Sequence, residues 1–219
     1  MEFISEIFSF FLHIDEELKA LTAQYGVWTN VILFLIIFCE TGLVVTPFLP
    51  GDSLLFATGA IAADPASGLD PLFLYIILTI AAIIGDSVNY SIGRRYGVRI
   101  FEWNLPFVKP EHLEKTNAFY AKHGAKMIVL ARFAPIVRTY APFVAGIANM
   151  DYKTFLTYNV AGGILWTTIF IWAGYFFGNL PFVQKNFELV ALAIIILSVM
   201  PIVYEVWQDR KHKKVAAAK

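Results

Sequence analysis

Charged residues, prolines and glycines inside long apolar stretches constrain this chain more than any other feature of its sequence. Six stretches are predominantly apolar: 27–49, 54–63, 72–92, 127–147, 155–177 and 189–206. Apolar residues make up 58% of the 219 residues and charged residues only 16%, which leaves too little polar surface to cover a water-soluble globule. The sequence therefore predicts an all-α polytopic membrane protein with a single domain over residues 1–219.

Two of these regions are too broken to cross a bilayer as one helix. Residues 27–63 contain two prolines and a glycine near their centre, which leaves two arms shorter than the roughly 20 residues that a span needs. Residues 125–149 contain Arg132 and Arg138, and each arginine costs about 2.5–3.5 kcal/mol at the centre of a spanning helix. We therefore expect one re-entrant hairpin at 27–63 and another at 125–149.

The distribution of basic residues sets the expected topology. Lysines and arginines gather between the third and fourth stretches and again at the C-terminus, and the positive-inside rule places both clusters in the cytoplasm. An even number of crossings must then separate them, so residues 125–149 enter and leave on one side. The expected order is an interfacial helix at 1–25, hairpin 27–63, span 72–97, interfacial helix 111–123, hairpin 125–149, spans 153–178 and 187–207, and a basic cytoplasmic tail at 208–219.

A weak internal similarity supports this arrangement. Residues 48–62 resemble residues 134–148, and both pair a proline-containing break with a later segment of small and apolar residues. Two such units in opposed orientation form the inverted repeat of many transporters, whose broken helices meet near the middle of the membrane.

Five ionisable residues lie in or beside the apolar stretches: Glu40, Asp52, Asp86, Arg132 and Arg138. A charge inside the membrane is expensive unless it is paired, hydrated or faces a cavity. We expect Arg132 and Arg138 to bind a phosphate, because guanidinium forks hold its oxygens bidentately and stay charged. We assign proton coupling to Glu40 and Asp52, because ionised carboxylates repel the anion and protonation relieves that repulsion.

Structural ion pairs that only dock the hairpins are the alternative for these charges, and for Asp86 with Asn89 this alternative is as strong as a functional role. Ser53 joins Asp86 and Asn89 as an accessory candidate, since Asp52 or Ser53 can cap a short helix starting near Leu54. Residues 51–54 spell the nucleophile motif of GDSL hydrolases, yet the sequence places no base within reach of the serine. We therefore expect no catalytic residue and no enzyme activity.

Composition narrows the range of ligands that the chain is expected to bind. The 17 basic residues balance the 17 acidic ones, so the chain lacks the positive field that nucleic acids require. One cysteine and four scattered histidines predict neither a metal site nor a disulfide, and we expect no cofactor.

Several motifs together resemble the DedA family of bacterial inner-membrane proteins over nearly the whole chain. They are Phe38-Cys-Glu-Thr-Gly42, Pro47-Phe-Leu-Pro-Gly-Asp-Ser-Leu-Leu55, Gly85-Asp-Ser-Val-Asn-Tyr90, Ala131-Arg-Phe-Ala-Pro-Ile-Val-Arg138, Gly146-Ile-Ala-Asn-Met150 and Gly174-Tyr-Phe-Phe-Gly178. The resemblance implies the hairpin architecture and a link to moving polyprenyl phosphate, or phospholipid, across the membrane with the proton gradient. The family's acid pair falls on Glu40 and Asp52, and its arginine pair on Arg132 and Arg138.

The leading hypothesis is a multi-pass transporter of the bacterial inner membrane with a cytoplasmic C-terminus. It would move undecaprenyl phosphate, or a related phospholipid, between leaflets, with membrane lipids and protons as its partners. A small-ion/proton antiporter and a non-transporting membrane scaffold are the alternatives. The residues specify neither the exact lipid nor an oligomeric state.

Overall fold

The structure, a computed structural model, describes residues 18, 21–22, 24–43, 51–97, 124–133, 135–186, 189–190 and 193. This part of the chain is helical and contains no strand. Its elements are α3 (Trp28–Gly42), α4 (Gly51–Ala62), the 3-10 turn η1 (Pro65–Ser67), α5 (Pro71–Tyr96), the 3-10 turn η2 (Gly124–Lys126), α8 (Met127–Ala131), α9 (Pro135–Ile147), α10 (Tyr152–Phe177) and α11 (Pro181–Lys185).

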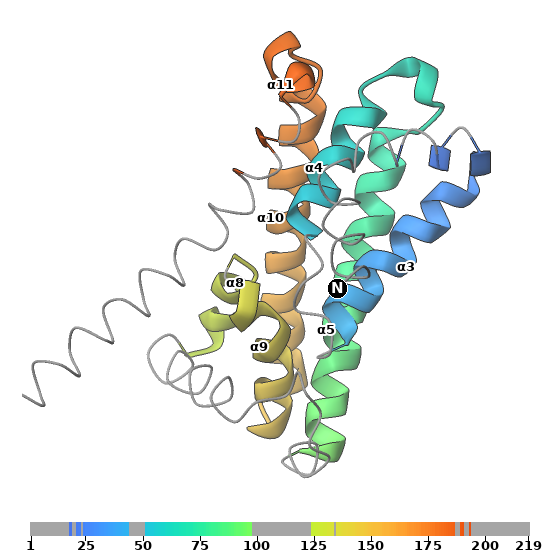
Figure 1. Ribbon diagram of the computed structural model, residues 1–219. Helices are drawn as coiled ribbons and strands as arrows, with labels where there is room; N and C mark the ends of the chain where they lie inside the picture. Colours follow the sequence, from blue (N-terminus) through green and yellow to red (C-terminus); the bar gives the residue numbers. More distant parts are fainter. Residues whose placement is uncertain are drawn as a thin grey trace, which may run out of the picture.

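The two long helices, α5 and α10, form the centre of the fold and run in opposite directions (Figure 1). Each has 26 residues, about 39 Å at 1.5 Å per residue, and is apolar and long enough to cross a membrane. Each also begins at an aspartate cap: Asp70 accepts a hydrogen bond from the backbone N–H of Phe73, and Asp151 accepts one from Thr154. Gly97 ends α5 with a φ of +52°, a conformation that favours glycine.

The four shorter helices α3, α4, α8 and α9, called the arms below, pack on this pair in an exchanged arrangement. α3 packs against α5 and α4 against α10, so the two arms of the first half rest on different long helices. α8 packs against α10 and α9 against α5, which repeats the pattern with the long helices interchanged. Each long helix is thereby held by one arm from each half of the chain.

Glycines bring the second arm of each half close to its long helix. A Cβ at Gly174 in α10 would overlap the carbonyl oxygen of Phe56 in α4. A Cβ at Gly93 in α5 would overlap the carbonyl oxygen of Phe143 in α9. Gly93 and Gly174 lie at the same position relative to their N-caps, and small residues allow this close approach between membrane helices. The internal similarity of residues 48–62 and 134–148 therefore corresponds to two equivalently packed arms.

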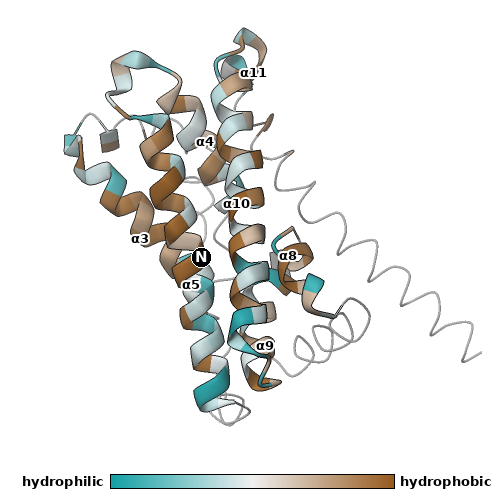
Figure 2. Ribbon diagram, turned by 180° about the vertical axis from the view of Figure 1, so that it is seen from behind, coloured by the Kyte–Doolittle hydropathy of each residue, from teal (hydrophilic) through white to brown (hydrophobic). Residues whose placement is uncertain are grey.

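The outer surface of the long helices is apolar along most of its length. Figure 2 shows hydrophobic residues over the middle of α5 and hydrophilic residues at the end that carries Arg94 and Arg95. Many large apolar side chains are exposed on these helices, among them Ile76, Ile80 and Ile169. Such a surface suits contact with lipid rather than with water.

Several expected segments can be compared with these bounds. α5 and α10 lie within one residue of the spans expected at 72–97 and 153–178. The expected breaks within 27–63 and 125–149 separate α3 from α4 and α8 from α9. Between the spans expected at 153–178 and 187–207 lies the short helix α11 (Pro181–Lys185). The interfacial helix at 111–123 and the tail at 208–219 lie outside the described residues, as do most of residues 1–25 and 187–207.

Candidate functional site

The charged site begins where Glu40, near the end of α3, meets the first residue of α4. The backbone N–H of Gly51 donates a hydrogen bond to Glu40 Oε1 at 3.2 Å. A Cβ at position 51 would overlap the Glu40 carboxylate, so a larger residue there would displace the carboxylate from its present position. Glu40 thus satisfies a backbone donor that the start of a helix leaves free, and its negative charge suits the positive end of the helix dipole.

This geometry corrects the expected cap of the short helix. α4 begins at Gly51 rather than near Leu54, so Asp52 and Ser53 lie inside its first turn and not at the N-cap. The reason is that a carboxylate from another helix supplies the acceptor that a local side chain was expected to supply.

Arg138, in the first half of α9, joins the two acids carried by α3 and α4. Its Nη2 donates to Glu40 Oε1, and its Nη1 donates to Asp52 Oδ1 at 2.8 Å. Asp52 Oδ1 also accepts a hydrogen bond from the indole N–H of Trp166 at 2.8 Å. Glu40 and Asp52 are 1% and 5% exposed, so this ion-pair cluster is enclosed by protein.

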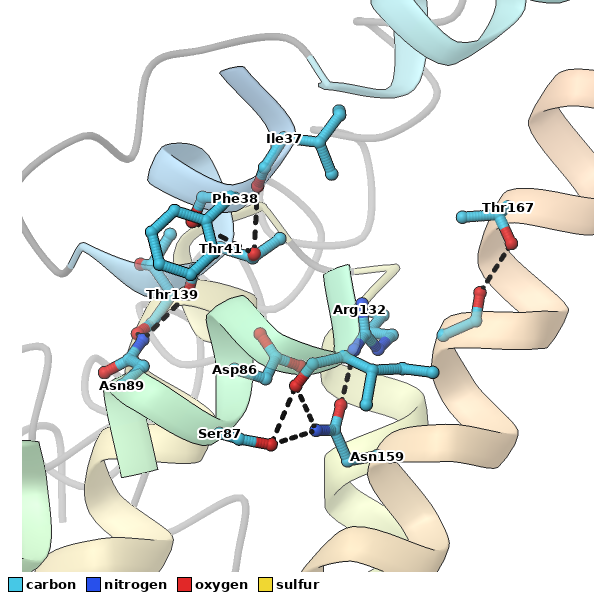
Figure 3. Close-up of polar contacts among 12 residues, drawn as sticks. Ile37, Phe38, Thr41, Asp86, Ser87, Asn89, Arg132, Thr139, Asn159 and Thr167 are labelled. Atoms are coloured by element: carbon cyan, nitrogen blue, oxygen red, sulfur yellow. Dashed lines mark hydrogen bonds and ion pairs between the residues drawn. The ribbon is translucent and has the colours of Figure 1, made fainter. Parts of the chain in front are cut away.

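Arg132, the C-cap residue that follows α8, forms a second cluster with α5 and α10 (Figure 3). Its Nη2 donates to Asp86 Oδ2 at 2.5 Å and to Asn159 Oδ1 at 2.6 Å. Asn159 in turn donates to the carbonyl oxygen of Ile83 and to Ser87 Oγ. Asp86 therefore forms an ion pair with Arg132, and Asn159 ties the arginine to both long helices.

Trp166 brings the two clusters together. The guanidinium carbons of Arg132 and Arg138 lie 5.8 and 5.7 Å from the centre of its ring, within the range of cation–π attraction. The two arginines, six residues apart in sequence, thus converge on one buried aromatic side chain. The break between the end of α8 at Ala131 and the start of α9 at Pro135 lets them do so.

A small enclosed cavity of about 10 Å³ lies between the clusters and is lined by Glu40, Thr41, Asp86, Arg132, Arg138, Thr139 and Trp166. This volume admits about one water molecule and is far too small for a phosphate group. Glu40 Oε2 and Arg132 Nε are buried without a hydrogen-bond partner among the described residues. The site is therefore closed, yet it keeps an acceptor and a donor that a small polar guest could satisfy.

The accessory candidates lie at different places. The amide of Asn89 donates to the carbonyl oxygens of Thr41 and Thr139, at 3.1 and 2.8 Å, and so ties α3 and α9 to α5 outside the charged clusters. Ser53 is buried one residue after Asp52. Neither side chain lines the cavity.

Two residues at the centre of the site escaped the sequence analysis. Asn159 is an uncharged polar side chain in an apolar span, and a search restricted to ionisable residues passes over it. Trp166 lies near the middle of α10, whereas tryptophans that anchor a membrane protein lie near helix ends. Its central position in the span was the feature of the sequence that could have identified it as part of a buried site. Both are fully or almost fully buried.

The arginines of the site are occupied by the protein's own side chains. Arg138 holds two acids and Arg132 holds one acid and one amide, so any anion that reached the guanidinium groups would have to compete with these partners. Among the described residues, no group of three or more histidine, cysteine or acidic side chains is placed to hold a metal ion.

Comparison with known proteins identifies the family. The model of the VTT domain matches residues 49–176, which contain both arms that carry Asp52 and Arg138. Protein DedA of Escherichia coli strain K12 is 52% identical over 99% of this chain and 98% of its own length. No solved structure matches the chain.

More distant relatives are described as membrane proteins. The uncharacterized membrane protein Rv0364 of Mycobacterium tuberculosis strain H37Rv is 41% identical over 80% of this chain and 79% of its own length. The inner membrane protein YqjA of Escherichia coli strain K12 is 33% identical over 79% of this chain and 78% of its own length. The resemblance found in the motifs is thereby confirmed, and the chain belongs to the DedA family of VTT-domain membrane proteins.

Proposed function

We propose that this protein moves a lipid phosphate between membrane leaflets, with polyprenyl phosphate such as undecaprenyl phosphate, or a related phospholipid, as its substrate. The observation that carries the proposal is the convergence of Arg132 and Arg138 on Trp166, with both guanidinium groups held by acids that a phosphate can displace. The head group would pass through the protein while the hydrocarbon chain stays in the lipid. The protein acts in this proposal as a transporter and not as an enzyme.

Proton coupling follows from competition for Arg138. While Glu40 and Asp52 are ionised, they occupy both terminal nitrogens of the Arg138 guanidinium group and repel an incoming phosphate. Protonation of either acid weakens its hold and frees a nitrogen for a phosphate oxygen. Loss of the proton returns the carboxylate to the arginine and expels the head group, so proton movement and lipid release are linked.

The exchanged arms supply a route for the movement itself. We propose that α3 with α4 and α8 with α9 form re-entrant hairpins that open to opposite faces and meet at the charged site, as broken helices do in inverted-repeat transporters. The inner membrane would contain the chain with both basic clusters and the C-terminus in the cytoplasm, and residues 187–207 would form the third span.

The two alternative functions make different demands on the site. A cation/proton antiporter gains nothing from Arg138, which already neutralises the acids that would bind its cation. A scaffold needs the ion pairs only to dock the arms. This second alternative is favoured by the closed cavity, and it is the one that an experiment must separate from transport.

The experiment measures leaflet exchange of fluorescent polyprenyl phosphate in liposomes that contain the purified protein. We expect exchange well above that of protein-free vesicles, and about a hundredfold loss in Arg138→Gln and Arg132→Gln, because each loses two charge-assisted hydrogen bonds to phosphate. Arg94→Gln is the matched control, since Arg94 is exposed and remote from the cavity.

Folding must be measured on the same variants. Asp86→Asn combined with Arg132→Gln keeps the shape of the second cluster without its charges, so we expect a folded protein that does not move lipid. A wild-type protein that fails to accelerate exchange, or a double variant that transports normally, would contradict the proposal.

A further inference from the structure

A groove on the outer surface between α5 and α10 is separate from the charged cavity. It has a volume of about 570 Å³ and runs along the second half of α5 beside the first residues of α10. Its walls are largely apolar and include Ile84, Val88, Ile92 and Leu156. Such a lining suits a hydrocarbon chain.

The length of the groove matches one leaflet. It extends along α5 from Ile83, at the middle of that helix, to Tyr96, its last residue, which is about 20 Å at 1.5 Å per residue. The hydrocarbon core of a bilayer is about 30 Å thick, so one leaflet contributes about 15 Å before the head-group region begins. A single lipid from the leaflet next to Tyr96 can therefore lie along the whole groove.

The end of the groove near the membrane surface is suited to an anionic head group. Arg95, Tyr96 and Tyr152 line this end, and all three are exposed. Among the residues that the structure describes, Arg95 has no acidic partner, so its guanidinium group can bind a phosphate. Tyrosines at this depth place an apolar ring in the lipid and a hydroxyl group at the surface.

The groove also comes close to the charged site, through Ser87. Ser87 lines the groove and accepts a hydrogen bond from the Asn159 amide at 3.3 Å. Asn159 Oδ1 in turn lies 2.6 Å from Arg132 Nη2. One hydrogen-bonded pair, visible in Figure 3, therefore separates the groove from the nearer of the two buried arginines.

We propose that the groove binds one anionic lipid, with its phosphate at Arg95 and a hydrocarbon chain against Val88 and Ile92, and that it is the lateral route to Arg132. The binding of the lipid is independent of transport, whereas the role as a route rests on the function proposed above. Separation of Ser87 from Asn159 is the step that lets the head group move from Arg95 to Arg132.

The test uses the full chain in nanodiscs of phosphatidylcholine that contain a small fraction of phosphatidylglycerol with a photoactivatable chain. Mass spectrometry then locates the labelled residues. We expect stronger labelling between residues 83 and 96 than around Ile76 and Ile80, which are exposed on the other half of α5. Photoactivatable phosphatidylcholine, which has no net charge, should label the groove more weakly.

Two pairs of variants sharpen the result. Ser91→Trp fills the groove from an exposed position and should abolish its labelling, whereas Ile80→Trp, outside the groove, should not. Arg95→Gln should weaken labelling about tenfold through loss of one charged contact, and Arg94→Gln, which does not line the groove, should leave it unchanged.

The outcomes separate this proposal from the proposed function. Arg132→Gln should keep groove labelling and lose lipid exchange, because the groove loads before the buried arginine takes the head group. Labelling no stronger than at Ile80, whether because bulk lipid or another segment of this chain covers the surface, overturns the binding proposal. A Ser91→Trp variant that loses labelling yet exchanges lipid at the wild-type rate overturns the role as a route.

Discussion

The ion pair between Asp86 and Arg132 offers a direct measurement of what the buried charges contribute to stability. Asp86→Asn removes the charge that faces the guanidinium group, and Arg132→Gln removes the guanidinium group itself. Each single variant leaves the other charge without its counterion. The double variant leaves neither charge, so the two single changes and their combination form a double-mutant cycle.

The geometry sets the expected size of the effect. The two side chains are 5% and 6% exposed and their atoms lie 2.5 Å apart, so solvent screens their interaction very little. Removal of one partner from a buried pair costs about 3–5 kcal/mol, while replacement of both by neutral groups is often close to neutral. We therefore expect each single variant to lower the free energy of unfolding by about 3–5 kcal/mol, and the double variant to recover most of that loss.

Reversible unfolding of the purified protein in lipid bicelles is the assay, and a neutral pair in the same fold is its control. Thr79 and Thr167 join α5 to α10 through hydroxyl groups 2.7 Å apart, both buried. Hydrogen-bonded pairs of this kind in a membrane protein average about 0.6 kcal/mol of coupling. If the coupling between Asp86 and Arg132 is no larger than that between the threonines, the reasoning from buried charge is refuted.

Three other outcomes are expected. Glu40→Gln and Asp52→Asn should keep or strengthen head-group binding but lose transport driven by a pH gradient. Binding assays and gradient-driven exchange on the same preparations test this expectation. Loss of binding would contradict it. Trp166→Phe should lower the free energy of unfolding by about 1–3 kcal/mol, because Asp52 loses a buried donor; an unchanged value in denaturation would contradict this. In otherwise cysteine-free protein, Ala66→Cys should react with an impermeant reagent added outside intact cells and Arg95→Cys should not, because Ala66 lies just before the start of α5 and Arg95 lies in its last turn. The reverse pattern would invert the topology.

The long helices were predictable from the sequence because their signals are local. α5 and α10 combine an aspartate cap, a continuous apolar run and a terminal glycine, and each signal lies within the element that it defines. The breaks in the two hairpin regions were predictable for the same reason. Pro142 is an exception, because it lies inside α9 without ending the helix. Backbone groups freed by a proline can find other partners within a packed membrane protein.

The partners in the site were less predictable because they depend on contacts between distant segments. The five charged residues are visible in the sequence, but the sequence could not show that Arg138 pairs with Glu40 and Asp52. Nor could it show that Arg132 pairs with Asp86. The start of α4 was misplaced for the same reason, since its acceptor is Glu40, eleven residues earlier. Local patterns identify which residues can interact, whereas the exchanged packing of the arms decides which ones do.

The exchanged packing of the arms also imposes an order on the folding of the chain during its synthesis. A ribosome completes α4 long before it makes α10, so the surface on which α4 packs does not yet exist when α4 leaves the ribosome. In the same way, Asp52 cannot form its hydrogen bonds until Arg138 and Trp166 have been synthesised. The arms α3 and α4 therefore complete their packing only after the second half has been synthesised. A chain arrested before α10 leaves Asp52 without its Trp166 donor and leaves the surface of α4 that packs on α10 uncovered.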